Sequence, residues 1–362
     1  MLYLYSFKEK QVTNKAFILI IIFSVLITSP SIFAQTKEKV VSHDTERLEF
    51  ESGHFKIVGE LRISKSDGKY PLVIMVHGDG PARMTYFYAL KKRFLRAGYA
   101  TMMWDKPGAG QSTGELSQKH LKSERAQILL NAIEHVKGHP RIATSRIGVW
   151  GISQAGHVIP MALTKTEDIS FMIMVGCMGE TGIQQSGYQI LRQLQFAGLS
   201  EEEAIEAENH FIQIFYAKSF EQYIEHAKPL YDNPVQRKLG FVSALWDETN
   251  WKPFFPDTEA FYDPIPVIEK VTIPVLAFFG KLDTQVDPVQ GVEAYTKALT
   301  KAGNKNFRVE LIPNADHDII LSKTGSMEER SRRSAKGWQN YAPEYLNIME
   351  DWLKKQKMAP GK

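Results

Sequence analysis

Two serines lie in glycine-flanked segments that could present a nucleophile to a substrate. GQSTG, residues 110–114, fits the pattern G-x-S-x-G at every position, whereas GISQAG, residues 151–156, carries Ala155 in place of the second glycine. Such a turn needs a strand that runs straight into the serine and a helix that leaves it. The hydroxyl then stands clear of the sheet, and the helix N-terminus faces the negative charge that develops during attack.

The context of each turn favours Ser153 as the nucleophile. The apolar segment at residues 146–150 leads directly into Gly151, and a helical pattern begins near Gln154. Ser112 instead follows a loop rich in proline and glycine and precedes a polar segment. We therefore predict that Ser153 acts as the nucleophile and that Ser112 is a turn residue.

A serine is a weak nucleophile unless a base and an orienting acid accompany it. Asp283 and His317 each follow an apolar segment near the end of the chain. In the predicted arrangement His317 accepts the proton of Ser153 and later protonates the leaving group, while Asp283 holds the imidazole in the required tautomer. Asp287 lies close to Asp283 in DTQVD and is a rival for the role of the acid.

Backbone amides are the expected partners of the developing oxyanion. The turn HGDGP, residues 77–81, directly follows another apolar segment. We predict that the N–H groups of Asp79 and Gln154, with Gly80 as a further donor, form an oxyanion hole.

The elements that must position these residues form a regular series. Helical patterns, among them 123–138 and 289–302, alternate with short segments that are apolar at nearly every position: 71–76, 99–104, 146–150, 171–176, 274–280 and 307–313. This alternation predicts an α/β fold with a mostly parallel, doubly wound sheet, preceded by a β-hairpin around Ser52 and Gly53. Strands of such a sheet end at one edge, so residues far apart in the chain meet there.

An insertion interrupts the series after the sixth predicted strand. Its first part is helical, with a capping box formed by Ser200 and Glu203, and its second part is aromatic and rich in proline. We predict a lid over the carboxyl edge of the sheet. Four aromatic residues either line a substrate pocket or attach the lid to the sheet: Trp246, Trp251, Phe254 and Phe255.

The N-terminal segment predicts export. Lys8, Lys10 and Lys15 precede the apolar run 16–27, and Ala34 offers a cleavage point, as in a secretory signal peptide. The run is shorter than the ~20 residues of a membrane span, so an uncleaved anchor is the lesser interpretation. A periplasmic or secreted protein without membrane attachment is expected. The predicted parts are a signal peptide, two halves of one hydrolase core and the lid between them: 1–34, 35–179, 267–362 and 180–266.

Composition excludes several other classes of protein. The 362 residues carry a formal net charge of +3, with Lys and Arg dispersed among acidic residues, so no nucleic-acid partner is expected. Neither metal-ligand spacing nor a phosphate-binding loop is present, and serine chemistry needs no cofactor. The single cysteine, Cys177, lies in an apolar run and is expected to be buried.

Five motifs in chain order resemble those of the α/β-hydrolase superfamily: HGDGP, WDKPGAGQSTG, GISQAG, GKLDTQVDP and NADHD. Within this superfamily the chain resembles bacterial serine esterases related to the acyl-thioester hydrolase and dipeptidyl-peptidase catalytic domains, over about Phe55 to Leu353. The resemblance implies that the segment containing Ser112 is a structural loop, and it assigns the triad to Ser153, Asp283 and His317.

The expected function is cleavage of a small-molecule carboxylic ester through an acyl-enzyme. A peptidase or amidase remains an alternative, and the resemblance also allows a lactone esterase of the macrolide type. A catalytically silent binding protein that uses the same cleft is the alternative from another class. The sequence leaves the oligomeric state open.

Overall fold

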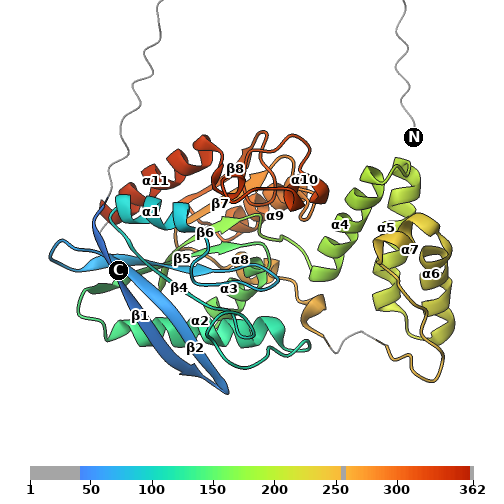
Figure 1. Cartoon of the computed structure of the whole chain (residues 1–362), viewed down its shortest axis with the longest axis horizontal. Coiled ribbons are helices and arrows are strands. Elements are labelled where there is room, and N and C mark those ends of the chain that lie inside the picture. The colour runs from blue at the N-terminus through green and yellow to red at the C-terminus, as the bar shows by residue number, and fades with distance from the viewer. Residues whose placement is uncertain (1–40, 254–257, 359–362) are drawn as a thin grey trace, which may run out of the picture. The chain divides into compact units, whose positions relative to one another are not determined.

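The fold is built on one mixed sheet, seen in the computed structural model, which describes residues 41–253 and 258–358. Within these residues eight strands pair in the order β1-β2-β4-β3-β5-β6-β7-β8 (Figure 1). Pairing is antiparallel between β1, β2 and β4 and parallel elsewhere. The strands are β1 His43–Ser52, β2 Phe55–Ser64, β3 Tyr70–Val76, β4 Ala100–Trp104, β5 Ile142–Ile152, β6 Ile169–Val175, β7 Val275–Gly280 and β8 Phe307–Ile312.

Helices cover both faces of the sheet, which explains why the central strands are apolar throughout. On β3, Leu72 and Ile74 belong to the core formed with α2, α3 and α9, whereas Val73 and Met75 belong to the core formed with α1 and α11. The predicted doubly wound arrangement is therefore present. The covering helices are α1 Tyr88–Arg96, α2 Leu121–Lys137, α3 Ala155–Leu163, α9 Pro288–Lys301 and α11 Pro343–Met358.

A group of helices lies between β6 and β7, inside the segment predicted as an insertion. The helices between residues 182 and 239 have their own hydrophobic core, which includes Leu194, Ala207 and Tyr223, whereas Ile268 of the last helix belongs to the core of the sheet. The expected capping box is present, since the Ser200 hydroxyl accepts a hydrogen bond from the N–H of Glu203 at 3.2 Å and the Glu203 carboxylate accepts one from the N–H of Ser200 at 2.8 Å. The elements are α4 Gly182–Phe196, α5 Glu201–Tyr216, α6 Phe220–Asp232, α7 Pro234–Leu239, η1 Glu259–Phe261 and α8 Ile265–Ile268.

The register of the parallel strands brings their carboxyl ends to one edge. Val76 at the end of β3 is opposite Gly151 of β5, and Gly280 at the end of β7 is opposite Ile312 at the end of β8. The loops that carry the predicted site residues therefore begin at the same edge of the sheet. The loop after β8 also contains α10 Met327–Ser331 and η2 Gly337–Gln339.

Among the residues that the structure describes, no helix combines the length and the apolar character needed to cross a membrane. The predicted signal peptide and its cleavage point after Ala34 lie outside the described residues. Cys177 is buried in the core beneath α3, as expected.

Candidate active site

Ser153 occupies the sharp turn between β5 and α3. It is one of few non-glycine residues with a left-handed backbone, at φ +56°, a conformation that costs a bulky side chain about 1–3 kcal/mol. Its N–H donates to the carbonyl of Val175 on the neighbouring strand at 2.9 Å, which holds the strained peptide in place. The methyl group of Ala155 is accommodated because residue 151 is glycine: a Cβ there would lie 2.8 Å from the Cβ of Ala155.

The loop after β3 passes directly beside Ser153. A Cβ on Gly78 would come within 3.0 Å of the Cβ of Ser153, so glycine is what allows the two segments to approach so closely. The next residue, Asp79, lines the same cavity as Ser153. Among the described residues, none accepts a hydrogen bond from the N–H of Asp79 or of Gln154. Both predicted oxyanion donors are thus free to bind a ligand.

His317 and Asp283 form a buried pair. The Nδ1 atom of His317 lies 2.7 Å from Oδ2 of Asp283. The other carboxylate oxygen of Asp283 accepts hydrogen bonds from the N–H groups of Gln285 and Val286, at 2.7 and 3.0 Å. Burial by itself would lower the pKa of His317, but the charge of Asp283 and the hydrogen bond to it raise that pKa above 6.5. The pair therefore favours a histidine that readily takes up a proton.

Asp287, the rival acid, has a different role. Its carboxylate caps the N-terminus of α9, where it accepts hydrogen bonds from the N–H groups of Val289 and Gln290. The structure places Asp283, and not Asp287, against His317.

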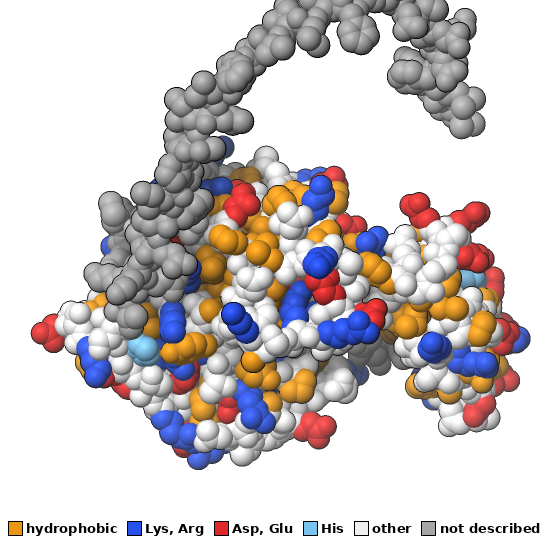
Figure 2. All heavy atoms as spheres, turned by 45° about the horizontal axis from the view of Figure 1, so that its top comes forward, with side chains coloured by type: hydrophobic (Ala, Val, Ile, Leu, Met, Phe, Trp, Pro, Cys, Tyr) orange, Lys and Arg blue, Asp and Glu red, His pale blue; other side chains and the backbone are white. Residues whose placement is uncertain are grey.

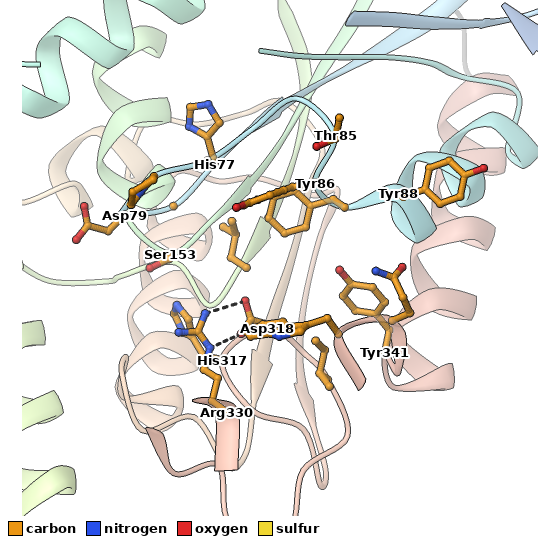
Figure 3. A pocket seen from close by; sticks show the side chains of 18 of the residues that line it. His77, Asp79, Thr85, Tyr86, Tyr88, Ser153, His317, Asp318, Arg330 and Tyr341 are labelled. Atoms are coloured by element: carbon orange, nitrogen blue, oxygen red, sulfur yellow. Dashed lines mark hydrogen bonds and ion pairs between the residues drawn. The ribbon is translucent and has the colours of Figure 1, made fainter. Parts of the chain in front are cut away.

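A cavity of about 770 Å³ contains both Ser153 and His317. In Figure 3, Asp79, Ser153 and His317 lie on one side of the view, and Tyr88 and Tyr341 lie on the other. Trp338 also contributes to the wall. The cavity thus extends away from Ser153 between aromatic side chains.

These aromatic residues were not identified from the sequence as pocket residues. Tyr86, Phe87 and Tyr88 form a run shortly after HGDGP, and Trp338 and Tyr341 belong to GWQNYA. Aromatic clusters next to a predicted site loop were the signal that could have found them.

The aromatic residues that were predicted lie elsewhere. Trp251 is buried in the insertion, where its ring stacks on Tyr223 at a centroid distance of 6.0 Å, and Trp246 is 46% exposed. Neither is among the residues that line the cavity beside Ser153. Phe254 and Phe255 lie outside the described residues.

One charged pair lines the cavity next to the histidine. The Arg330 guanidinium donates to both carboxylate oxygens of Asp318, at 2.8 and 3.3 Å (Figure 3). It also lies 5.2 Å from the centre of the Trp338 ring. Asp318, immediately after His317, is therefore an ion-pair partner. Because the carboxylate of Asp318 neutralises the charge of Arg330, this guanidinium is less suited to bind an anionic group.

Ser112 is a structural residue. It is buried, and its hydroxyl accepts a hydrogen bond from the N–H of Val58 on β2 at 2.9 Å. Asp105, at the start of the same loop, accepts hydrogen bonds from the N–H groups of Met84 and Gln111. The G-x-S-x-G match in GQSTG thus belongs to a loop that braces the edge of the sheet.

The first helix of the insertion contacts the loop that carries Asp283. The Tyr188 hydroxyl of α4 donates to the backbone carbonyl of Asp283 at 3.0 Å, and the Gln185 side chain donates to the carbonyl of Gln285 at 2.5 Å.

In the described part of the chain, no group of three or more His, Cys, Asp and Glu side chains is arranged to hold a metal ion. The face in Figure 2 carries Lys and Arg interspersed with Asp and Glu.

Comparisons with known proteins agree with this geometry. A family model described as X-Pro dipeptidyl-peptidase (S15 family) matches residues 34–317. The chain is also similar to an uncharacterised 31.7 kDa protein from the traX-finO intergenic region of Escherichia coli, with 23% identity over 238 residues, or 65% of this chain and 80% of that protein.

Two solved structures share the architecture. The Pyrococcus furiosus esterase Pf2001 aligns with a TM-score of 0.52 and 16% identity over 86% of this chain and 93% of the esterase. The Pyrococcus horikoshii acylaminoacyl peptidase aligns with a TM-score of 0.51 and 18% identity over 88% of this chain and 42% of the peptidase. These likenesses confirm the α/β-hydrolase fold that the sequence predicts.

Proposed function

The chain belongs to the X-Pro dipeptidyl-peptidase (S15) family and is a hydrolase, and from this premise we propose that it cleaves carboxylic esters with a Ser153–His317–Asp283 triad. One observation carries the proposal: the buried His317–Asp283 pair opens into the same cavity as a serine on a strained strand-to-helix turn. This combination is what nucleophilic catalysis by serine requires.

The proposed reaction has two halves. His317 donates its Nδ1–H to Asp283, which leaves a lone pair on Nε2 to accept the Ser153 proton as Oγ attacks the substrate carbonyl. The tetrahedral oxyanion accepts hydrogen bonds from the N–H groups of Asp79 and Gln154, with Gly80 as a further candidate donor. The imidazolium then protonates the leaving alcohol, and water attacks the acyl-enzyme by the same route to release the acid.

The cavity supports a substrate with a bulky apolar group. Tyr86 and Tyr88 are 47% and 43% exposed, and they line the cavity together with Trp338. Aromatic walls gain most from covering an apolar or aromatic group. The neutralised Arg330–Asp318 pair favours an uncharged ester over an anionic one.

A panel of substrates tests this function on the purified protein. It compares p-nitrophenyl and naphthyl esters of increasing acyl size with Xaa-Pro p-nitroanilides, lactones and anionic esters. We expect turnover of neutral, bulky esters that is lost in Ser153→Ala, together with labelling of the wild type by a fluorophosphonate. Faster cleavage of the Xaa-Pro anilides would favour the peptidase alternative, which the description of the family also supports. A folded wild-type protein that stays unlabelled would favour a binding protein.

We also propose that the protein is exported to the periplasm or beyond, on the strength of the basic and apolar N-terminal segment. Cell fractionation, followed by sequencing of the mature N-terminus, tests this. A mature chain that starts after Ala34 is expected, and an intact N-terminus in the cytosolic fraction would contradict the proposal.

A further inference from the structure

Two buried cations hold the carbonyl groups of the HGDGP turn. Lys106, which follows β4, donates from Nζ to the carbonyls of Gly78 and Gly80 at 2.8 and 2.7 Å. Arg125 of α2 donates to the carbonyl of His77 and to the side-chain oxygen of Gln154. The side chains of Lys106 and Arg125 are buried, and neither residue lines the cavity at Ser153. Both therefore lie behind the turn.

The geometry of the peptide bond links these contacts to the oxyanion hole. In a trans peptide the C=O of one residue and the N–H of the next point in opposite directions. When Lys106 holds the carbonyl of Gly78 behind the turn, the N–H of Asp79 must point away from Lys106, to the side where Gly78 approaches Ser153. This same N–H has no acceptor among the described residues.

Arg125 connects the two segments that supply the predicted donors of the oxyanion hole. Its contacts with His77 and Gln154 bridge the HGDGP turn and the residue after the nucleophile. These two segments supply the two predicted amide donors. A single buried guanidinium thus fixes their spacing, with the rigid fork that makes arginine suited to this task.

Buried cations are costly, which argues against a passive role. Burial, together with the charge of Arg125, lowers the pKa of Lys106 to about 7, and burial lowers the pKa of Arg125 to about 10. No carboxylate forms an ion pair with either side chain among the described residues; their hydrogen-bond acceptors are three backbone carbonyls and one amide oxygen. The charge of Asp79 opposes this fall in both pKa values without a direct ion pair, so hydrogen bonds are the contacts through which the two side chains act on the turn.

We propose that Lys106 and Arg125 are positioning residues that aim the backbone donors of the oxyanion hole at the reacting carbonyl. This inference rests on the proposed serine chemistry. It assigns the lysine of WDKPG, which the sequence places in a loop, to transition-state stabilisation through the neighbouring turn.

Lys106→Met tests the proposal, because it removes the donors and keeps most of the length of the side chain. The matched control is Lys122→Met, since Lys122 is also buried but donates to the carbonyl of Glu259 and not to the turn. With the best ester of the panel, we expect kcat of Lys106→Met to fall by about 10²–10³, with KM changed less than about threefold, as for loss of an oxyanion donor. Lys122→Met is expected to keep kcat within about threefold.

Two further readouts separate positioning from a general structural role. Affinity for a trifluoromethyl ketone, which forms a tetrahedral adduct with the serine, should fall in Lys106→Met by the same factor as kcat. Lys106→Arg, which can still reach both carbonyls, should have a kcat at least tenfold higher than that of Lys106→Met. If the methionine variant does not fold, Lys106→Arg is compared with the wild type, and a folded arginine variant that has lost about 10²–10³ in kcat would overturn the proposal.

The possible failures are distinguishable. A folded Lys106→Met with wild-type kcat, an equal loss in Lys122→Met, or a folded Lys106→Arg as inactive as the methionine variant would overturn the positioning role. Wild-type ester turnover that persists in Ser153→Ala would instead overturn the proposed function.

Discussion

The Nδ1 atom of His317 lies 2.7 Å from Oδ2 of Asp283, although 33 residues separate the two in the chain. Both side chains are almost fully buried, with 5% and 0% exposure. In such surroundings the carboxylate has two effects on the imidazole: it fixes the tautomer, and it opposes the fall in pKa that burial would cause. The pH dependence of the reaction should report both.

The first prediction concerns this pH dependence. The proton acceptor must be neutral, so kcat/KM should rise with pH through the pKa of His317, which lies above 6.5. In Asp283→Asn the effect of burial is no longer opposed by this carboxylate, although the charge of Asp318 still raises the pKa of His317, so the residual activity should rise through a lower pKa. pH–rate profiles of both proteins measure this shift. Coincident acidic limbs would contradict the assignment of the acid.

Asp283→Asn should also lower kcat by about 10⁴, as the loss of the orienting acid does in related chemistry. Asp287→Asn is the matched control, because Asp287 caps α9 and asparagine caps a helix as well as aspartate does. It should retain wild-type kcat. Equal losses in the two variants would move the acid to Asp287.

Ser153→Ala should lower kcat by roughly 10⁴ to 10⁶, because the nucleophile and its base act as one unit. Steady-state turnover and fluorophosphonate labelling measure the loss, and circular dichroism checks the fold. A variant that keeps near-wild-type turnover would contradict the proposed role of Ser153 as the nucleophile.

Ser112→Ala should give the opposite pattern. It leaves the N–H of Val58 without its partner in a buried position, which costs about 1–3 kcal/mol of unfolding free energy. The kcat should stay within about twofold of wild type. Denaturant unfolding and ester turnover measure the two quantities, and a large loss of kcat in folded protein would restore Ser112 as a candidate nucleophile.

Glu180, just before α4, should make stability depend on pH. Burial, followed by repulsion from Asp287 and Glu208, raises its pKa from 4.5 to about 7. A carboxyl with a raised folded-state pKa destabilises the protein once it ionises, so this cost is absent below pH 4.5 and complete above pH 7. Glu180→Gln should therefore raise the free energy of unfolding by about 1–3 kcal/mol at pH 8 and leave it unchanged at pH 4.5.

The exposed Glu51 provides the control, since Glu51→Gln should change stability at neither pH. Chemical denaturation at the two pH values measures the difference. An equal effect of Glu180→Gln at both would show that ionisation of Glu180 is not responsible.

Much of the fold, and the edge of the sheet at which the candidate site residues lie, could be predicted because they depend on local patterns. Segments that are apolar at nearly every position predicted the parallel sheet. The carboxyl ends of parallel strands lie at one edge, whatever the separation of the strands in the chain. The contact between Asp283 and His317 follows from that rule. The choice between Asp283 and Asp287 does not follow from that rule, because it depends on where the turn before α9 places each carboxylate.

The cavity walls and the cations behind the turn could not be predicted in the same way. Tyr86, Tyr88 and Trp338 lie in segments without periodicity, so their side-chain directions depend on the path of each loop. Lys106 looks like an ordinary charged loop residue in the sequence. Its burial becomes visible only when the loop after β4 is packed beneath the HGDGP turn.

The hydrogen bond from the Tyr188 hydroxyl to the peptide carbonyl of Asp283 couples the inserted helices to the loop after β7. A mutation that shifts α4 would therefore also displace the backbone of Asp283, although α4 contributes no residue to the cavity wall. Under the proposed mechanism, sequence drift in the inserted helices would then change turnover without any change in the residues that contact the substrate.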